Sequence, residues 1–234
     1  MPAPEIAEVI ASIGALGTAS YGLVDAAKFM WNGGPSSAGF GFIRQTLAPF
    51  APALTAVGYG DFIETARANW LNGAPLANQK AKAKALIHLG LTGATAPQLA
   101  SATGMSTADL SAVAAKIDQG VVLEPKDVNL LGRFDAIVEA TLDAGFERAD
   151  QRYRNTAKAL ASGVSVVLAI VGGAIIHGQG LPESTPFRLA EYYRTGDFLR
   201  ALFIGLLATP LAPVAKDLSS ALVAAVTAVT RPRR

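Results

Sequence analysis

The chain has 234 residues, room for one medium-sized domain or two small ones. Hydrophobic residues make up 51% and charged residues 16%, below the roughly 25% charged share of soluble domains, so the composition favours a membrane protein. The formal net charge of +2 is too small to indicate a nucleic-acid partner, and the lack of cysteine excludes disulfides, thiolate metal sites and thiol nucleophiles.

The fold class predicted from this composition is all-α. Aromatic residues are few, at 7%, whereas glycine alone contributes 23 residues. Small residues allow helix backbones to approach each other where lipid supplies no hydrophobic drive between them. We therefore expect an integral membrane helical protein with about three transmembrane helices and a small cytoplasmic helical domain.

The first predicted element is an N-terminal transmembrane helix within residues 1–31. The run from Val9 to Val24 carries no charge, and Asp25, Lys28 and Trp31 at its end suit a membrane interface. The span is placed at residues 8–28. Because the uncharged run is short for a span, a buried helix of a soluble bundle remains open as an alternative.

Residues 32–155 are predicted to form the cytoplasmic helical domain. The segment before residue 77 is rich in proline and glycine and indicates a connector with short helices. An apolar stripe then predicts an amphipathic helix that continues towards the next span, because neither Gly nor Pro interrupts the chain between Phe146 and Ser162. The stripe consists of Leu130, Phe134, Ile137, Val138 and Leu142.

Residues 96–117 resemble a helix-turn-helix. The small Ala100, Gly104 at the turn, and the apolar Leu110 have the spacing of such a hairpin. A helix that reads a DNA groove needs donors, but the second helix offers Lys116 against Asp109. The sequence therefore predicts a compact hairpin for packing or partner contact and no nucleic-acid binding.

The C-terminal membrane domain is placed at residues 156–234. It contains two spans, at residues 159–178 and 199–215, followed by a terminal amphipathic or bundling helix that ends in a basic tail. Small residues four apart form one face along each span and predict helix–helix contact. The predicted helix-packing residues are Ala161, Ser165, Ala169, Gly173, Ala201, Gly205 and Thr209.

The positive-inside rule sets the expected orientation. Arg148, Arg152, Arg154 and Lys158 precede the second span, and the C-terminus is strongly basic, so both are expected in the cytoplasm. The protein is therefore predicted to be integral to the plasma (inner) membrane, with its N-terminus outside.

Four polar residues are candidates for a pore or another polar membrane site, namely His177, Lys216, Asp217 and Ser220. The alternative is that they are interfacial anchors. No catalytic motif, cofactor motif or metal-ligand spacing is found, so no enzyme activity, cofactor or metal is expected.

The function expected from these patterns is that of a non-enzymatic membrane protein. Its small-residue faces predict a homo-oligomeric assembly or scaffold subunit, in contact with the lipid bilayer and with other membrane proteins. Two alternatives stay open: an oligomeric channel lined by the C-terminal helix, and a soluble helical-bundle regulator.

Overall fold

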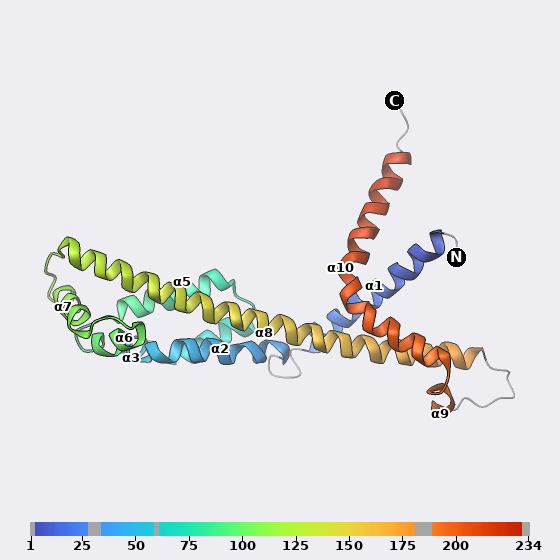
Figure 1. Ribbon diagram of the computed structural model, residues 1–234, viewed down its shortest axis with the longest axis horizontal. Helices are drawn as coiled ribbons and strands as arrows, with labels where there is room; N and C mark the ends of the chain where they lie inside the picture. Colours follow the sequence, from blue (N-terminus) through green and yellow to red (C-terminus); the bar gives the residue numbers. More distant parts are fainter. Residues whose placement is uncertain (1–2, 28–33, 59–60, 181–188, 231–234) are drawn as a thin grey trace. The chain divides into compact units, whose positions relative to one another are not determined.

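The computed structural model describes residues 3–27, 34–58, 61–180 and 189–230, with side chains given for 9–27, 34–58, 61–180 and 189–213. The described residues form helices and no strand (Figure 1), which confirms the all-α prediction. The helices are α1 (Ala3–Ala26), η2 (Gly34–Ser36), α2 (Ser37–Leu47), η3 (Ala48–Phe50), α3 (Ala51–Ala56), α4 (Phe62–Leu71), α5 (Leu76–Leu89), α6 (Ala96–Thr103), α7 (Thr107–Asp118), α8 (Pro125–Gln179), α9 (Leu189–Tyr192) and α10 (Gly196–Thr230).

The chain divides into two compact units. The first unit comprises Met1–Trp31 and Asn155–Arg234, and the second comprises Asn32–Arg154. Helix α8 contributes residues to both, because it continues without a break for 55 residues, as the uninterrupted sequence between Phe146 and Ser162 predicts.

The core of the second unit lies along the first part of α8. Phe134, Val138, Leu142 and Phe146 follow one another at intervals of four and are at most 1% exposed. Residues at this spacing lie on one face of a helix, so α8 presents a continuous apolar stripe to its neighbours. Three residues of the predicted stripe are thus confirmed as core. They pack with side chains of the shorter helices, among them Ile43, Leu47, Phe50, Trp70, Ile87, Leu99 and Leu110.

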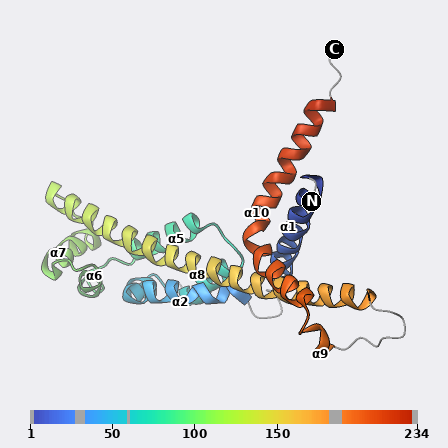
Figure 2. The same cartoon turned by 45° about the vertical axis from the view of Figure 1, so that its right-hand side comes forward.

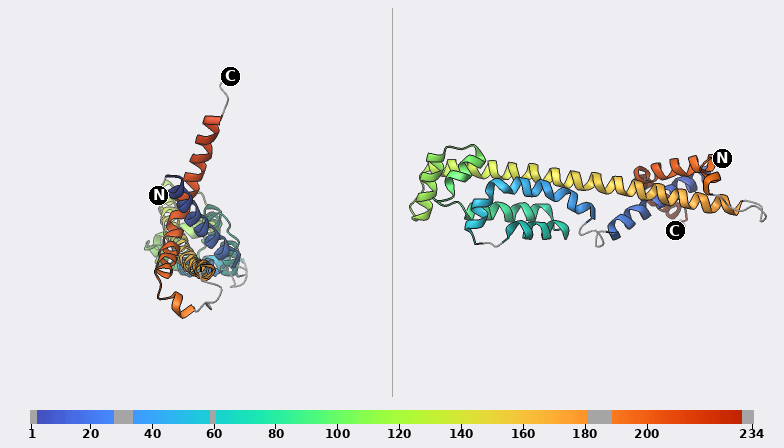
Figure 3. Two further views of the ribbon diagram at one scale, coloured as in Figure 1. Left: turned by 90° about the vertical axis from the view of Figure 1, so that its right-hand side faces the viewer. Right: turned by 90° about the horizontal axis from the view of Figure 1, so that it is seen from below.

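Helix α2 approaches α8 closely, and Figure 3 shows the two side by side. A Cβ on Gly39 would lie 2.5 Å from the carbonyl oxygen of Ala149, so only glycine fits there. The neighbouring Trp70 of α4 donates from Nε1 to the carbonyl oxygen of Ser36 at 2.6 Å. This bond satisfies the indole N–H inside the core.

The hairpin resembling a helix-turn-helix is formed by α6 and α7. Gly104 ends α6 with a φ of 66°, a left-handed conformation that glycine adopts without steric cost. Ser106 then caps α7, because its side-chain oxygen accepts from the backbone N–H of Asp109 at 3.3 Å.

Ion pairs join α5 to α8 at the surface of the second unit. Lys84 Nζ donates to Asp135 Oδ2 and to Glu139 Oε2, both at 2.8 Å, and Lys80 pairs with Asp143. The bonds to the two carboxylates raise the pKa of Lys84. The bond from Lys84 in turn lowers the pKa of Asp135, against the opposing effect of burial.

Candidate functional site

Three helices are long and apolar enough to cross a membrane within the described ranges. They are Val9–Ala26 in α1 with a mean hydropathy of 1.3, a window of α8 with 2.3, and Gly196–Pro213 in α10 with 1.2. All three belong to the first unit, whose residues after Asn155 include the apolar part of α8. The sequence prediction of three helices with the length and composition of spans is confirmed.

Large apolar side chains of the first unit point outwards. On α8, Val167, Val171 and Ile175 lie four residues apart and are 60%, 51% and 57% exposed, and Phe203 of α10 is 62% exposed. Soluble monomers rarely expose a contiguous apolar surface of this kind, whereas lipid chains solvate it at no cost. The distribution of side chains fits helices that are able to cross a membrane.

Small residues of the first unit lie instead where its helices touch. A Cβ on Gly205 of α10 would lie 2.5 Å from Cα of Val166 in α8, so the two backbones are in direct contact. Of the predicted helix-packing residues, Ala161, Ser165, Ala201, Gly205 and Thr209 are buried, and Ala169 and Gly173 are partly buried.

Helix α1 packs on α10, as Figures 1 and 2 both show. At the crossing, a Cβ on Gly17 would overlap the carbonyl oxygen of Ala208 and lie 2.7 Å from its carbonyl carbon. The same atom would lie 3.0 Å from Cβ of Ala212. The contact between the two helices therefore depends on the missing side chain of Gly17.

Hydroxyl groups are also turned into the first unit. Ser20 is fully buried and donates to the carbonyl oxygen of Leu16 in its own helix at 2.8 Å. Ser165 Oγ and Thr209 Oγ1 are buried without a hydrogen-bond partner among the described residues. The interior of the first unit therefore holds mainly small residues and a few hydroxyls, while many of its large apolar side chains are exposed, unlike the usual arrangement of a soluble bundle.

A polar cluster lies where α8 ends and α10 begins. His177 Nδ1 and Asp197 Oδ2 are 2.9 Å apart, and Asp197 Oδ1 accepts from a guanidinium nitrogen of Arg200 at 3.1 Å. Asp197 stands in the first turn of α10, where the helix dipole favours a carboxylate. Thr195 fixes the same turn, because its hydroxyl accepts from the backbone N–H of Phe198 at 3.3 Å.

Tyr192 of α9 is the buried aromatic residue beside this cluster. Its ring centroid lies 5.5 Å from that of His177 and 5.8 Å from that of Phe198. Its hydroxyl donates to the carbonyl oxygen of Ile170 at 3.4 Å and would be 2.5 Å from a Cβ on Gly173. Gly173 thus makes room for the tyrosine, and burial raises the pKa of that phenol.

The polar cluster borders an apolar cleft of about 610 Å³ in the first unit. This volume falls within the roughly 300–1,000 Å³ typical of small-molecule sites. Helices α1, α8 and α10 all contribute to its walls. The lining residues are Leu16, Leu168, Ala169, Gly172, Gly173, Ile176, His177, Gly180, Asp197, Arg200, Ala201 and Ile204.

Only part of this site was predicted. His177 was a candidate, but its partners Asp197 and Arg200 were missed. The available signal was topological, since consecutive antiparallel spans bring the end of one and the start of the next to the same membrane face. Lys216, Asp217 and Ser220 lie in α10, but their side chains fall outside the part that the structure describes.

The described residues contain no group of three or more His, Cys, Asp or Glu side chains that could hold a metal ion. His88 of α5 instead lies beside one carboxylate, with Nε2 2.9 Å from Asp135 Oδ1 but outside hydrogen-bond geometry. Its ring packs edge-on against Phe134 at 5.4 Å.

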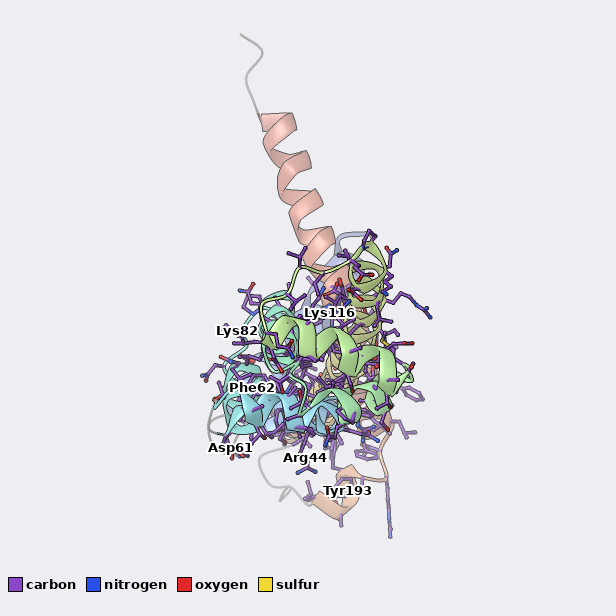
Figure 4. The ribbon with its side chains drawn as sticks, turned by 90° about the vertical axis from the view of Figure 1, so that its left-hand side faces the viewer. Arg44, Asp61, Phe62, Lys82, Lys116 and Tyr193 are labelled. Carbon is purple, nitrogen blue, oxygen red and sulfur yellow. The ribbon has the colours of Figure 1, made fainter. Side chains whose placement is uncertain are left out.

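The basic residue of the α6–α7 hairpin, Lys116, forms an ion pair within the second unit. Lys116, labelled in Figure 4, donates from α7 to Asp127 Oδ2 of α8 at 2.6 Å. This bond raises the pKa of Lys116 and lowers that of Asp127. Because the lysine is engaged by a carboxylate, α7 offers little positive charge to a phosphate backbone.

In comparisons with known proteins, no family model, curated protein or solved structure matches the chain.

Proposed function

We propose that this chain is a non-enzymatic integral membrane protein and a scaffold subunit. Its three apolar helices span the bilayer and anchor the second unit at the cytoplasmic face. Copies of the chain associate with one another, and the second unit is the surface offered to other membrane proteins.

The observation that supports the membrane anchor is the exposure of large apolar side chains in the first unit, whose helices pack through small residues. Val171 and Phe203 are more than half exposed, while Ser165 and Ser20 are fully buried. In water this arrangement would leave a large apolar surface hydrated, at a cost of about 25 cal/mol for each Å². In lipid the cost disappears.

The chemistry of the cleft favours a structural role over catalysis. Among the described residues its lining contains no hydroxyl, thiol or lysine side chain, and the hydroxyl of the neighbouring Tyr192 donates to the carbonyl oxygen of Ile170. Asp197 is also bonded to Arg200, which holds the start of α10. The cluster is best interpreted as a polar contact that holds the end of α8 to the start of α10.

Self-association requires a surface that is not already used within one chain. The small residues Ala161, Ser165 and Gly205 are engaged in contacts inside the first unit. The stripe formed by Val167, Val171 and Ile175 is free for a neighbouring copy, since it lies outside these contacts. We therefore assign the contact between copies to this stripe.

The proposal is tested by extracting the membranes that contain the chain into lipid nanodiscs and measuring the mass of the particle. Before extraction the membranes are washed with alkaline carbonate, and we expect the chain to stay in the membrane pellet. In nanodiscs we expect a protein mass that is a multiple of 24.1 kDa. Val171→Trp should reduce that mass to one chain by blocking the stripe. A matched control, Phe203→Trp, replaces another outward residue and should leave the oligomer intact.

The two parts of the proposal fail separately. Release of the chain by carbonate would contradict the membrane anchor. Retention with a single-chain mass in the parent protein would contradict self-association and leave the anchor standing.

A further inference from the structure

The cleft of about 610 Å³ in the first unit runs along α8 for about the depth of one lipid leaflet. Its lining residues on this helix extend from Leu168 to Gly180, and a helix rises by about 1.5 Å per residue, so the lined length is about 18 Å. The hydrocarbon core of a bilayer is about 30 Å thick, which gives about 15 Å for each leaflet. The two lengths match.

The polar residues of the lining gather at one end of the cleft. His177 Nδ1 and Asp197 Oδ2 are 2.9 Å apart, and Arg200 follows one turn further along α10. Figure 1 shows the start of α10 beside the end of α8. The other lining residues are leucine, isoleucine, alanine and glycine. The cleft therefore has one polar end and an apolar remainder, as an amphipathic ligand requires.

Hydrocarbon is the content that suits the apolar part of the cleft. A volume of 610 Å³ equals that of about 20 liquid waters at roughly 30 Å³ each, and an empty space of this size would forfeit many dispersion contacts. Water is a poor filler, because apolar side chains offer it no hydrogen bonds. The walls belong to the three helices that are apolar enough to span a membrane, where the nearest hydrocarbon is a lipid acyl chain.

Arg200 provides donors for a phosphate at the polar end. Its Nη1 donates to Asp197 Oδ1 at 3.1 Å, whereas its Nε and Nη2 have no partner among the described residues. Asp197 would repel an anion if it were unpaired, but its two oxygens are engaged by His177 and Arg200. A guanidinium group matches the geometry of phosphate oxygens, so the remaining donors of Arg200 suit a phosphate.

We propose that this cleft binds one membrane phospholipid, with an acyl chain along α8 and the phosphate on Arg200. The inference rests on the proposed membrane anchor, which puts the end of α8 at the depth of the lipid phosphates. The depth of the cleft, its single polar end and the position of Arg200 together identify the ligand. The stripe of Val167, Val171 and Ile175 is not part of the lining, so lipid and a neighbouring copy use different surfaces.

Two lipids with identical acyl chains separate the contributions of hydrocarbon and phosphate. Phosphatidylglycerol carries the phosphate, and diacylglycerol lacks it. The full chain is purified in dodecyl maltoside, a detergent without phosphate, and each lipid is titrated into it. Native mass spectrometry counts the lipids that each protein retains. We expect one bound lipid for each chain, and an affinity about threefold higher for phosphatidylglycerol, as for an ion pair that is partly exposed.

Three variants assign the contributions. A Cβ on Gly172 would meet nothing within 4 Å, so Gly172→Trp places its ring in the cleft without moving the backbone and should abolish binding of both lipids. Gly22→Trp is the matched control, because its Cβ also meets nothing within 4 Å and it lies outside the cleft, and it should leave binding unchanged. Arg200→Gln should abolish the preference for phosphatidylglycerol and leave the binding of diacylglycerol unchanged.

The preference is a ratio between two lipids, so a general loss of folding cannot imitate the result expected for Arg200→Gln. Equal lipid retention by Gly172→Trp and the parent would overturn the proposal, because the lipid would then lie elsewhere on the helices. If that variant also lowers the oligomer mass, a neighbouring copy fills the cleft instead.

The proposed membrane anchor fails separately. Release of the chain by alkaline carbonate would overturn the anchor and the lipid site together. A chain that stays in the membrane pellet but shows equal affinity for the two lipids would contradict the lipid site alone.

Discussion

Replacing Gly17 by alanine tests the packing of the apolar helices α1 and α10. The new Cβ would overlap the carbonyl oxygen of Ala208 and lie 2.7 Å from its carbonyl carbon. Carbon atoms in ordinary contact are about 3.5–4.0 Å apart, so α1 and α10 would have to separate by about 1 Å. The obstructing atoms belong to the backbone and cannot rotate away.

The expected cost follows from two opposing effects. Overpacking a tight contact by one methyl group costs about 1–3 kcal/mol, whereas alanine stabilises a helix over glycine by about 0.5–1 kcal/mol. Gly17→Ala should therefore lower the free energy of unfolding by up to about 2.5 kcal/mol. Gly22→Ala is the matched control in the same helix, because its Cβ would meet nothing within 4 Å, and it should be neutral or stabilising.

The assay is a titration of the purified protein with SDS in mixed micelles, followed by the protease resistance of the first unit. The reasoning predicts that the midpoint of Gly17→Ala falls below that of the parent and that the midpoint of Gly22→Ala does not. Equal midpoints for the two variants would refute the direct contact between α1 and α10.

Three further predictions concern individual side chains. Phe134→Ala empties a fully buried site and should destabilise the second unit by about 3–5 kcal/mol in urea, whereas Val122→Ala, at an 88% exposed position, should change stability by less than about 0.5 kcal/mol. The pKa of Asp135 is lowered because Lys84 donates a hydrogen bond to it, so its contribution is present above pH ~4 and lost as the pH falls through the folded pKa. The pair is partly exposed and screened, so Asp135→Asn should remove less than about 1 kcal/mol of this pH dependence in urea titrations at pH 3 and 7. Tyr192→Phe removes one hydrogen bond of 3.4 Å and should cost less than about 1 kcal/mol by SDS titration, and a larger loss would indicate a stronger bond than the structure contains.

The helices of the fold were largely predictable because their signals are local. The continuous α8 follows from the uninterrupted sequence between Phe146 and Ser162, and the turn before α7 follows from Gly104. The course of α10 was less predictable. Pro210 and Pro213 each remove a backbone donor, yet the helix continues through both to Thr230.

The candidate sites were less predictable because they depend on residues far apart in sequence. His177 has a polar partner because α10 begins with Asp197, 20 residues later. A groove of about 240 Å³ in the second unit likewise requires residues of α4 and α5 to lie next to Phe146 of α8. No pattern within one helix predicts that Gln79 Oε1 lacks a hydrogen-bond donor among the described residues.

The most direct test of the membrane account is a topology map with single introduced cysteines. The sequence contains no cysteine, so each variant carries one thiol that can be labelled. Ala3→Cys, Val122→Cys and Arg194→Cys place one thiol before the first span, one in the second unit and one between the second and third spans. With a membrane-impermeant maleimide on intact cells, we predict labelling at positions 3 and 194, and labelling at 122 only after the membrane is permeabilised. Equal labelling of all three thiols in intact cells would contradict the three-span account.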